Sequence, residues 1–364
     1  MAKISNADSD MLRTNCGVPQ GSVFDPLLFL VYVNDISEYI KSSISLFADD
    51  TVLSYSSKCP YNLYSVLSSD LNNLQSWADL WSISCNASKT EVLNIFSNVS
   101  HHPPLQLANH LLSEVDSHKH LSLIFHHSLS WHTHVVSLYH KAITRLNVFK
   151  KLRLSVPRYI LLVLYLSYSL PLFDYGDIIY HNISTADSCR LENVQTSAAK
   201  LIRGCMQITS HSKILEELSM SPLHLRRNCH TLFALHKFLL GSCPIFLANL
   251  TPKLFPDLLV SNHSLSRGMN VQLPSCRTAL FHRSFFLRAS RLEVSTYICR
   301  ITRTKFASFQ SNCFHLWKVA SSTASLWRES TSHVYPSCKP RSIERTNIIA
   351  CVRVSFPRLR LIFC

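Results

Sequence analysis

The chain has 364 residues, 47% of them hydrophobic, so it is long enough for two domains with substantial cores. Six glycines are too few to suggest glycine-rich phosphate-binding loops. The net charge of +14 indicates a polyanionic partner. That charge lies in the tail, however, because residues 251–364 carry 17 Lys or Arg and 4 Asp or Glu. Residues 1–250 are nearly neutral, so composition gives no strong evidence for a nucleic-acid groove there.

The 13 cysteines show no CxxC spacing, which argues against a structural zinc site and favours thiols in a reducing compartment. The first 20 residues lack the apolar core of a signal peptide. The apolar stretch 159–172 is too short to cross a bilayer and contains Pro171. We interpret it as a buried helix, expect no membrane partner, and favour the cytoplasm or nucleus as the location.

The N-terminal region predicts a hairpin, a connector and a helix, in that order. Residues 1–16 look like the end of a β-hairpin, and Gly and Pro punctuate a non-helical connector over 17–22. Asp25 can cap a helix that has Pro26 in its first turn. The run 27–36 is apolar nearly all round, so this helix should be buried.

Further along, residues 44–55 predict a hairpin with an acidic turn. Residues 82–97 look like a turn between two strands, and residues 117–126 like a short hairpin. After about residue 250 the periodicity weakens. An amphipathic helix carries an apolar stripe of Leu63, Leu67, Leu71, Leu74, Trp77 and Trp81. Further helices are predicted over roughly 131–152, 157–169, 187–203, 212–219 and 222–240.

The acidic turn consists of Asp49 and Asp50. Two adjacent carboxylates repel each other unless a cation neutralises them. Mg²⁺ prefers oxygen ligands and commonly binds one or two carboxylates together with substrate phosphates. Taken alone, the pair is more simply a solvated turn. The surrounding motifs are what favour a metal site.

These motifs occur in a characteristic order along the chain. Near the pair they are Gly17-Val-Pro-Gln-Gly-Ser-Val23, Pro26-Leu-Leu-Phe29, Asn34-Asp35, Leu46-Phe-Ala-Asp-Asp-Thr51 and Asn86-x-x-Lys89-Thr90. Downstream they are Leu129-Ser-Trp-x-x-His134, Pro171-x-x-Asp174-Tyr-Gly176, Leu191-Glu-x-x-Gln195, Pro222-Leu with Arg226-Arg227, and Ser284-Phe-Phe with Arg291-Leu292. The whole set resembles the reverse transcriptase of non-LTR (LINE-like, jockey-type) retrotransposons over roughly residues 4–292.

The resemblance implies an α+β fold with three parts. A partial polymerase palm of antiparallel strands and packed helices would span 1–128, and a helical thumb and C-terminal region 129–250. Residues 251–364 would be a basic tail without clear pattern. The implied activity is RNA-directed DNA polymerisation, which is nucleotidyl transfer by a two-metal mechanism. Mg²⁺ would be the cofactor, and an RNA template, a DNA primer and deoxynucleoside triphosphates the partners.

The resemblance also implies roles for individual residues of the turn and its surroundings. Asp49 would bind the catalytic Mg²⁺ and Asp50 would support the metal site, with Phe47 and Ala48 preceding them at the substrate. Lys89 would protonate or electrostatically stabilise the pyrophosphate leaving group. The alternative for Lys89 is an exposed hairpin tip.

The connector would lie along the nascent base pair and the template. Its contributors are Pro19, Gln20 and Gly21, and a glycine without Cβ permits close approach of the backbone. The alternative for Gln20 is ordinary turn chemistry.

Two departures from the family pattern matter. Polymerase palms use another Asp on an upstream strand, but only Asp8 and Asp10 precede Gly17, and neither has a suitable context. We therefore expect a truncated domain that is inactive alone. A non-catalytic nucleic-acid-binding remnant is the alternative, and a relic without a selected role stays open. Ser122 replaces a glycine of the family's Tyr-Leu-Gly, which could disturb a backbone that needs positive φ.

Overall fold

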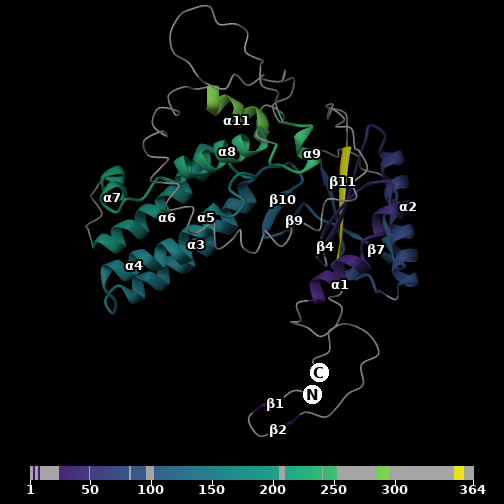
Figure 1. The fold of residues 1–364 in the computed structure, drawn as a ribbon, viewed down its shortest axis with the longest axis horizontal. Helices are drawn as coiled ribbons and strands as arrows, with labels where there is room; N and C mark the ends of the chain where they lie inside the picture. The colour runs from purple at the N-terminus through teal and green to yellow at the C-terminus, as the bar shows by residue number, and fades with distance from the viewer. Residues whose placement is uncertain are drawn as a thin grey trace, which may run out of the picture. The chain divides into compact units, whose positions relative to one another are not determined.

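The computed structural model describes residues 3–4, 7–8, 24–48, 50–81, 83–95, 102–204, 210–239, 241–251, 284–294 and 348–355. Two compact units are present, Met1–Ser130 with Ile343–Cys364, and Trp131–Ser342 (Figure 1). Strands concentrate in the first unit and long helices in the second. The expected mixture of helix and strand is therefore confirmed.

The first unit is built on a five-stranded sheet of order β3-β4-β11-β5-β8. Antiparallel pairing joins the first four strands, and β8 pairs parallel with β5. The yellow β11 lies beside β4 in Figure 1, although the two are far apart in the sequence. The strands are β3 (Ser43–Phe47), β4 (Asp50–Ser57), β11 (Ile348–Ser355), β5 (Glu91–Ile95) and β8 (Ser113–Glu114).

Helix α2 (Pro60–Leu80) packs on this sheet through the predicted apolar stripe. Trp81 differs from the rest of the stripe, because it follows the last helical residue and is 38% exposed. Leu53 and Val92 both pair with Val352, so one apolar row crosses three strands of the same core. The buried members of the stripe are Leu63, Leu67, Leu71, Leu74 and Trp77.

Polar contacts fix α2 to the segment that precedes the sheet. The buried carboxylate of Asp70 accepts the backbone N–H groups of Lys41 at 3.0 Å and Ser42 at 2.7 Å. The indole Nε1 of Trp77 donates to Asp35 at 2.9 Å, just before the 3₁₀ turn η1 (Ile36–Tyr39). Because buried N–H groups need partners, Asp70 replaces the water that these amides would otherwise bind.

The predicted buried helix that opens at Asp25-Pro26 and contains the run 27–36 differs from the structure in its end, its cap residue and its burial. Helix α1 (Asp25–Tyr32) ends earlier, and its cap residue is Phe24 rather than Asp25. Its outer face is exposed at 48% to 69%, at Leu27, Leu28 and Val31. The physical reason is that α1 contacts the core along one side only, while its sequence is apolar all round.

The region 82–97 also differs from the prediction of two strands. Residues 83–86 are extended without strand pairing, and a 3₁₀ turn η2 (Ala87–Lys89) leads directly into β5. Two predicted short hairpins are confirmed, namely β1 (Lys3–Ile4) with β2 (Ala7–Asp8) and β9 (Ser117–His120) with β10 (Leu123–His126). A third hairpin, β6 (Gln106–Leu107) with β7 (His110–Leu111), was not predicted.

The second unit is helical, and the five predicted helices are confirmed within a few residues. The predicted segment 157–169 is a short α-helix continued by a π-helical turn. The expectation that this stretch is buried is wrong on one side, because Tyr159, Val163 and Tyr168 are 67%, 56% and 52% exposed. The elements are α3 (His132–Leu152), α4 (Arg158–Leu164), η3 (Tyr165–Ser169), α5 (Leu170–Asp174), α6 (Thr185–Arg203), α7 (His211–Glu217), α8 (Leu223–Leu239), α9 (Ile245–Ala248) and α11 (Phe285–Val294).

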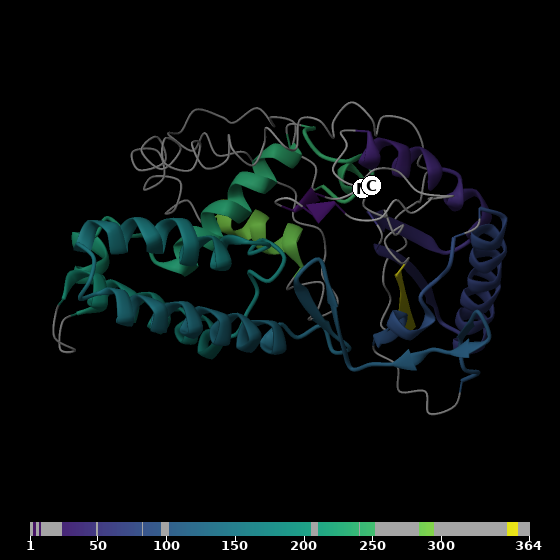
Figure 2. The same cartoon turned by 90° about the horizontal axis from the view of Figure 1, so that it is seen from below.

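Aromatic packing joins α11 to α8, which lie side by side in both views (Figures 1 and 2). The ring of Phe238 lies 5.6 Å from that of Phe285 and 5.9 Å from that of Phe286. In the described part of the chain, no helix has the length and apolar character needed to cross a bilayer.

Two downstream motifs of the sequence meet at the start of α8. Glu192 on α6 accepts the N–H groups of Leu223 at 3.1 Å and His224 at 2.7 Å, which caps that helix. Gln195 donates to the backbone oxygen of Ser221 at 3.0 Å. Residues spaced along the sequence as separate motifs therefore form one helix-capping cluster.

The β9–β10 turn provides a stability test. Ser122 has φ of +67°, in the left-handed region where a side chain is disfavoured. We expect Ser122→Gly to raise the free energy of unfolding by about 0.5–1 kcal/mol, measured by urea denaturation. Ser117→Gly, in strand β9 of the same hairpin, is the matched control and should lower stability. A destabilised Ser122→Gly variant would contradict this backbone.

Buried histidine in the second unit makes stability depend on pH. Burial lowers the pKa of His134 from 6.5 to about 4, with a smaller contribution from Lys141. Between these two pKa values the unfolded chain binds a proton that the folded chain does not bind. The free energy of unfolding is therefore highest above pH 6.5 and falls as the pH decreases from 6.5 to 4. We expect His134→Gln to reduce the loss of stability between pH 7 and 5, measured by urea denaturation at each pH.

The exposed His140 on the same helix provides the control. His140→Gln should leave the pH dependence of stability unchanged. An equal effect of both substitutions would show that burial of His134 is not the cause.

Candidate functional site

The acidic turn joins β3 to β4 at one end of the sheet. Phe47 pairs with Asp50, and Ala48 begins the turn between them. Ala48 has φ of +49°, which tight two-residue hairpin turns require and which alanine adopts only with strain. Phe47 is 53% exposed beside the turn. The side chain of Asp49 lies outside the described residues.

Asp50 is held by an arginine from the far end of the chain. Its Oδ1 accepts from Arg353 Nη2 at 2.6 Å and from Nε at 3.1 Å. The two side chains are 19% and 26% exposed, so water screens this pair less than it screens a surface ion pair. Arg353 Nη1 also donates to the backbone oxygen of Lys119 at 3.2 Å, which ties the β9–β10 hairpin to the same guanidinium.

Histidines complete this polar cluster. Burial lowers the pKa of His120, and Arg353 and His118 lower it further, while Asp50 acts in the opposite direction. The buried Nδ1 of His120 has no hydrogen-bond partner among the described residues. His118 bonds to Glu91, the residue directly opposite Arg353 on β5. The cluster therefore combines the Asp50–Arg353 pair with the Glu91–His118 pair.

Lys89 lies at the same end of the sheet as Asp50. Both β4 and β5 run antiparallel to β11, so their first residues share one edge. Lys89 is exposed and ends the turn just before β5. One strand, β11, separates the starts of β4 and β5. An ammonium group at this end of the sheet can contact a different part of a ligand from the carboxylate.

Hydrogen bonds within the turn account for the asparagine of the Asn-x-x-Lys motif. The backbone oxygen of Asn86 accepts from Lys89 N at 3.2 Å and from Thr90 Oγ1 at 2.9 Å. Its side-chain oxygen accepts from Ser88 at 2.7 Å. Asn86 therefore shapes the turn that presents the lysine. Beside the turn is an open hollow of about 460 Å³, lined in part by Cys85, Asn86, Ser88 and His110.

The structure brings four of the predicted site residues to one end of the sheet, namely Phe47, Ala48, Asp50 and Lys89. Their functional roles stay predictions. Those of Pro19, Gln20, Gly21 and Asp49 do so as well, because these four lie outside the described residues.

Arg353 was missed by the sequence reasoning. The one available signal was the alternation of inward Ala350, Val352 and Val354 with Arg353 between them, which is typical of a strand. Nothing in that alternation indicates which strand will be its neighbour. The partner of Asp50 therefore emerges only from the register of the folded sheet.

The described residues do not fit a divalent metal at Asp50. Both bonds from Arg353 go to its Oδ1, so a guanidinium already supplies the compensating charge. The nearby Glu91 is engaged by His118. A metal ion at this carboxylate would have to displace Arg353 or bear its repulsion.

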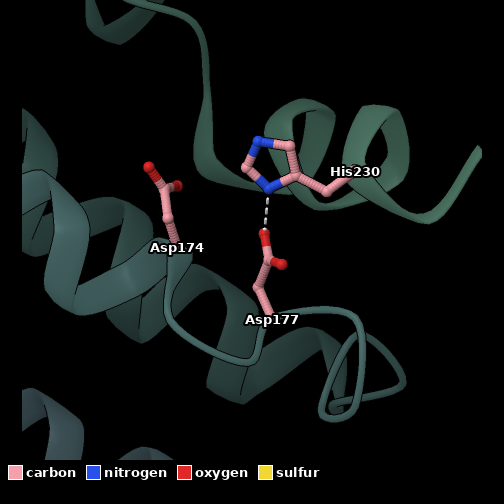
Figure 3. A group of neighbouring side chains, drawn as sticks. All are labelled: Asp174, Asp177 and His230. Atoms are coloured by element: carbon pink, nitrogen blue, oxygen red, sulfur yellow. Dashed lines mark hydrogen bonds and ion pairs between the residues drawn. The ribbon is translucent and has the colours of Figure 1, made fainter. Parts of the chain in front are cut away.

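A second acidic cluster lies in the second unit (Figure 3). Ligand atoms of Asp174, Asp177 and His230 lie within 4.8 Å of one another, which makes the group a possible metal site. His230 Nδ1 is 2.6 Å from Asp177 Oδ2, and Arg226 binds both oxygens of Asp174 at 3.1 and 2.6 Å. Burial raises the pKa of Asp177, and His230 opposes that shift. These charges already compensate one another, so the cluster serves here to join α5 to α8.

Comparison with known proteins shows which family part of the chain resembles. Residues 2–127 match the reverse transcriptase (RNA-dependent DNA polymerase) family. A probable RNA-directed DNA polymerase from transposon X-element of Drosophila melanogaster is 26% identical over 225 residues, which cover 59% of this chain and 25% of that protein. The RNA-directed DNA polymerase from mobile element jockey of Drosophila funebris is 30% identical over 138 residues, 36% of this chain and 15% of that protein.

A third relative extends the similarity further along the chain. The probable RNA-directed DNA polymerase from transposon BS of Drosophila melanogaster is 24% identical over 249 residues, 64% of this chain and 27% of that protein. The chain thus spans about a quarter or less of the length of these relatives. No solved structure matches at a significant level. The resemblance inferred from the ordered motifs is confirmed, and residues 2–127 are similar to the reverse transcriptase domain of non-LTR retrotransposon polymerases.

Proposed function

We propose that this chain is part of an RNA-directed DNA polymerase of a non-LTR retrotransposon and that it does not polymerise in the folded state described here. The observation that carries the first part is the Phe-Ala-Asp-Asp turn with Lys89 at the same end of the sheet. The partners would be an RNA template, a DNA primer and deoxynucleoside triphosphates. In the full-length ancestor the reaction would be nucleotidyl transfer by the two-metal mechanism, with Mg²⁺ as cofactor.

The residues at this end of the sheet would have different roles. Lys89 carries an exposed positive charge that would attract the triphosphate of a nucleotide. The exposed ring of Phe47 offers an apolar surface beside the acidic turn. Asp50 presents a carboxylate whose charge is already compensated, because Arg353 binds its Oδ1 twice. This last contact is the reason to expect inactivity.

A non-catalytic nucleic-acid-binding role is the second candidate, favoured by the charges of the second unit. No Asp or Glu occurs between residues 117 and 173. Helix α3 and the turn after it expose Lys141, Lys150, Lys151 and Arg153 to solvent. A basic surface without acidic neighbours in sequence suits the phosphates of a duplex. The overall near-neutrality of residues 1–250 conceals this local excess.

The inactivity is tested by primer extension. Purified full chain is mixed with an RNA template annealed to a DNA primer, deoxynucleoside triphosphates, and Mg²⁺ or Mn²⁺. We expect no primer extension above background, because the described carboxylate of the acidic pair is occupied by Arg353. Asp49→Ala is the matched control preparation. Extension by the natural sequence that Asp49→Ala abolishes would contradict the proposal.

Duplex binding is tested by substituting the basic surface. We expect the combined variant Lys150→Gln, Lys151→Gln and Arg153→Gln to weaken binding of an RNA–DNA duplex by at least tenfold at low salt. The slope of log affinity against log salt concentration should fall by about 2–3, since each lost phosphate contact removes about one unit. Fluorescence anisotropy at several salt concentrations measures both quantities.

A control for net charge uses Lys200, Arg203 and Lys213, which lie on α6 and α7. Their replacement by Gln removes the same charge elsewhere in the unit. An equal loss of affinity in the control would show that total charge, rather than the α3 surface, governs binding. Absence of any binding at low salt would reject the binding module.

A further inference from the structure

Strand β11 occupies the middle of the sheet although about 250 residues separate it from β5 along the chain. All eight of its residues pair with β4, from Ile348 opposite Ser57 to Ser355 opposite Asp50. Five of them also pair with β5. Among the described strands β4 and β5 have no direct pairing. Removing β11 would therefore leave two open strand edges facing each other.

Side chains of β11 complete the core on one face. Ala350, Val352 and Val354 are fully buried. Val352 lies between Leu53 on β4 and Val92 on β5, in the same core as the apolar stripe of α2. The gap between β4 and β5 thus fits an extended segment with small or branched apolar residues at alternate positions.

The opposite face of β11 places a positive charge against the acidic turn. Arg353 is opposite Glu91 on β5 and reaches Asp50 on the other side. A guanidinium is planar and binds carboxylate through several N–H groups, so it suits this position better than an ammonium. A segment that fills the gap between β4 and β5 therefore needs apolar residues at alternate positions and an arginine near the end that meets Asp50.

We propose that residues 348–355 form a built-in complementing strand that closes the reverse transcriptase sheet and blocks its acidic turn through Arg353. In this state the guanidinium takes the place of a divalent cation at Asp50. Metal binding at the turn is disfavoured while Arg353 stays at Asp50, because the guanidinium repels a cation. The blocking role rests on the proposed function, whereas the strand insertion does not.

Strand insertion is tested with the native thiol of Cys351, which lies opposite Ser54. Directly opposed residues of antiparallel strands have Cα atoms roughly 4.5–5.5 Å apart, within the range that a disulfide spans. In the full chain, Ser54→Cys with copper–phenanthroline as oxidant should form a disulfide with Cys351 inside one molecule. Peptide mapping by mass spectrometry identifies the linked residues.

The matched control is Ser56→Cys, which moves the new thiol two positions along β4, opposite Ile349. It should give little or no disulfide with Cys351. Equal yields from both variants, or no disulfide from Ser54→Cys, would overturn the register. A disulfide that links two molecules would overturn insertion within one chain and indicate strand exchange between copies.

The block is tested by the response of thermal unfolding to Mn²⁺. The natural chain should show the same unfolding temperature with EDTA and with millimolar Mn²⁺. Arg353→Gln should unfold at a lower temperature in EDTA and gain roughly 2–4 °C with Mn²⁺, because the freed carboxylate binds the ion in the folded state. Adding Asp50→Asn to Arg353→Gln should abolish the gain.

Arg203→Gln, which breaks an exposed pair with Glu217, is the control for loss of an arginine and should not respond to Mn²⁺. A Mn²⁺ response of the natural chain as large as that of Arg353→Gln would overturn the block, and so would no response in either. If Arg353→Gln does not fold, the disulfide experiment still decides the insertion. Neither measurement involves nucleic acid, so their failure is distinguishable from failure of the proposed function.

Discussion

Insertion of β11 between β4 and β5 is the constraint on which the first unit depends. Both neighbours pair with this strand and, among the described residues, not with each other. The apolar row of Leu53, Val352 and Val92 crosses all three strands and lies in the core that α2 covers. Because the buried stripe of α2 needs a continuous sheet beneath it, the helix and the strands stabilise one another.

The same insertion determines the chemistry at the acidic turn. Two carboxylates in a tight turn need a compensating cation. A metal ion can fill that need in a polymerase, but here a guanidinium does so at Asp50. The described carboxylate of the Phe-Ala-Asp-Asp hairpin is therefore paired with an arginine. A resemblance in sequence and the chemistry of the folded site are separate properties.

Much of the local structure follows from the sequence. Apolar residues at every third or fourth position define α2, and the acidic turn between two apolar runs defines the β3–β4 hairpin. Asn86 shapes the turn of the Asn-x-x-Lys motif through hydrogen bonds from Ser88 and Thr90. Each of these depends on contacts within a few residues, which composition and spacing encode directly.

Long-range features could not be predicted in the same way. The alternation in 348–355 is visible, but a strand pattern does not specify its partner, so Arg353 could not be assigned to Asp50. The exposure of Leu27 and Val31 was missed for a related reason, because an apolar helix does not reveal how many of its sides have neighbours. The bond between Asp174 and Arg226 likewise needed the packing of α5 against α8.

Hydrogen–deuterium exchange of the intact chain tests the central claim most directly. If β11 is a central strand, peptides covering Ile348–Ser355 should be protected to the same degree as those covering Asp50–Ser57, because both would open only when the sheet unfolds. Rapid exchange of Ile348–Ser355 together with strong protection of Asp50–Ser57 would contradict the insertion of β11.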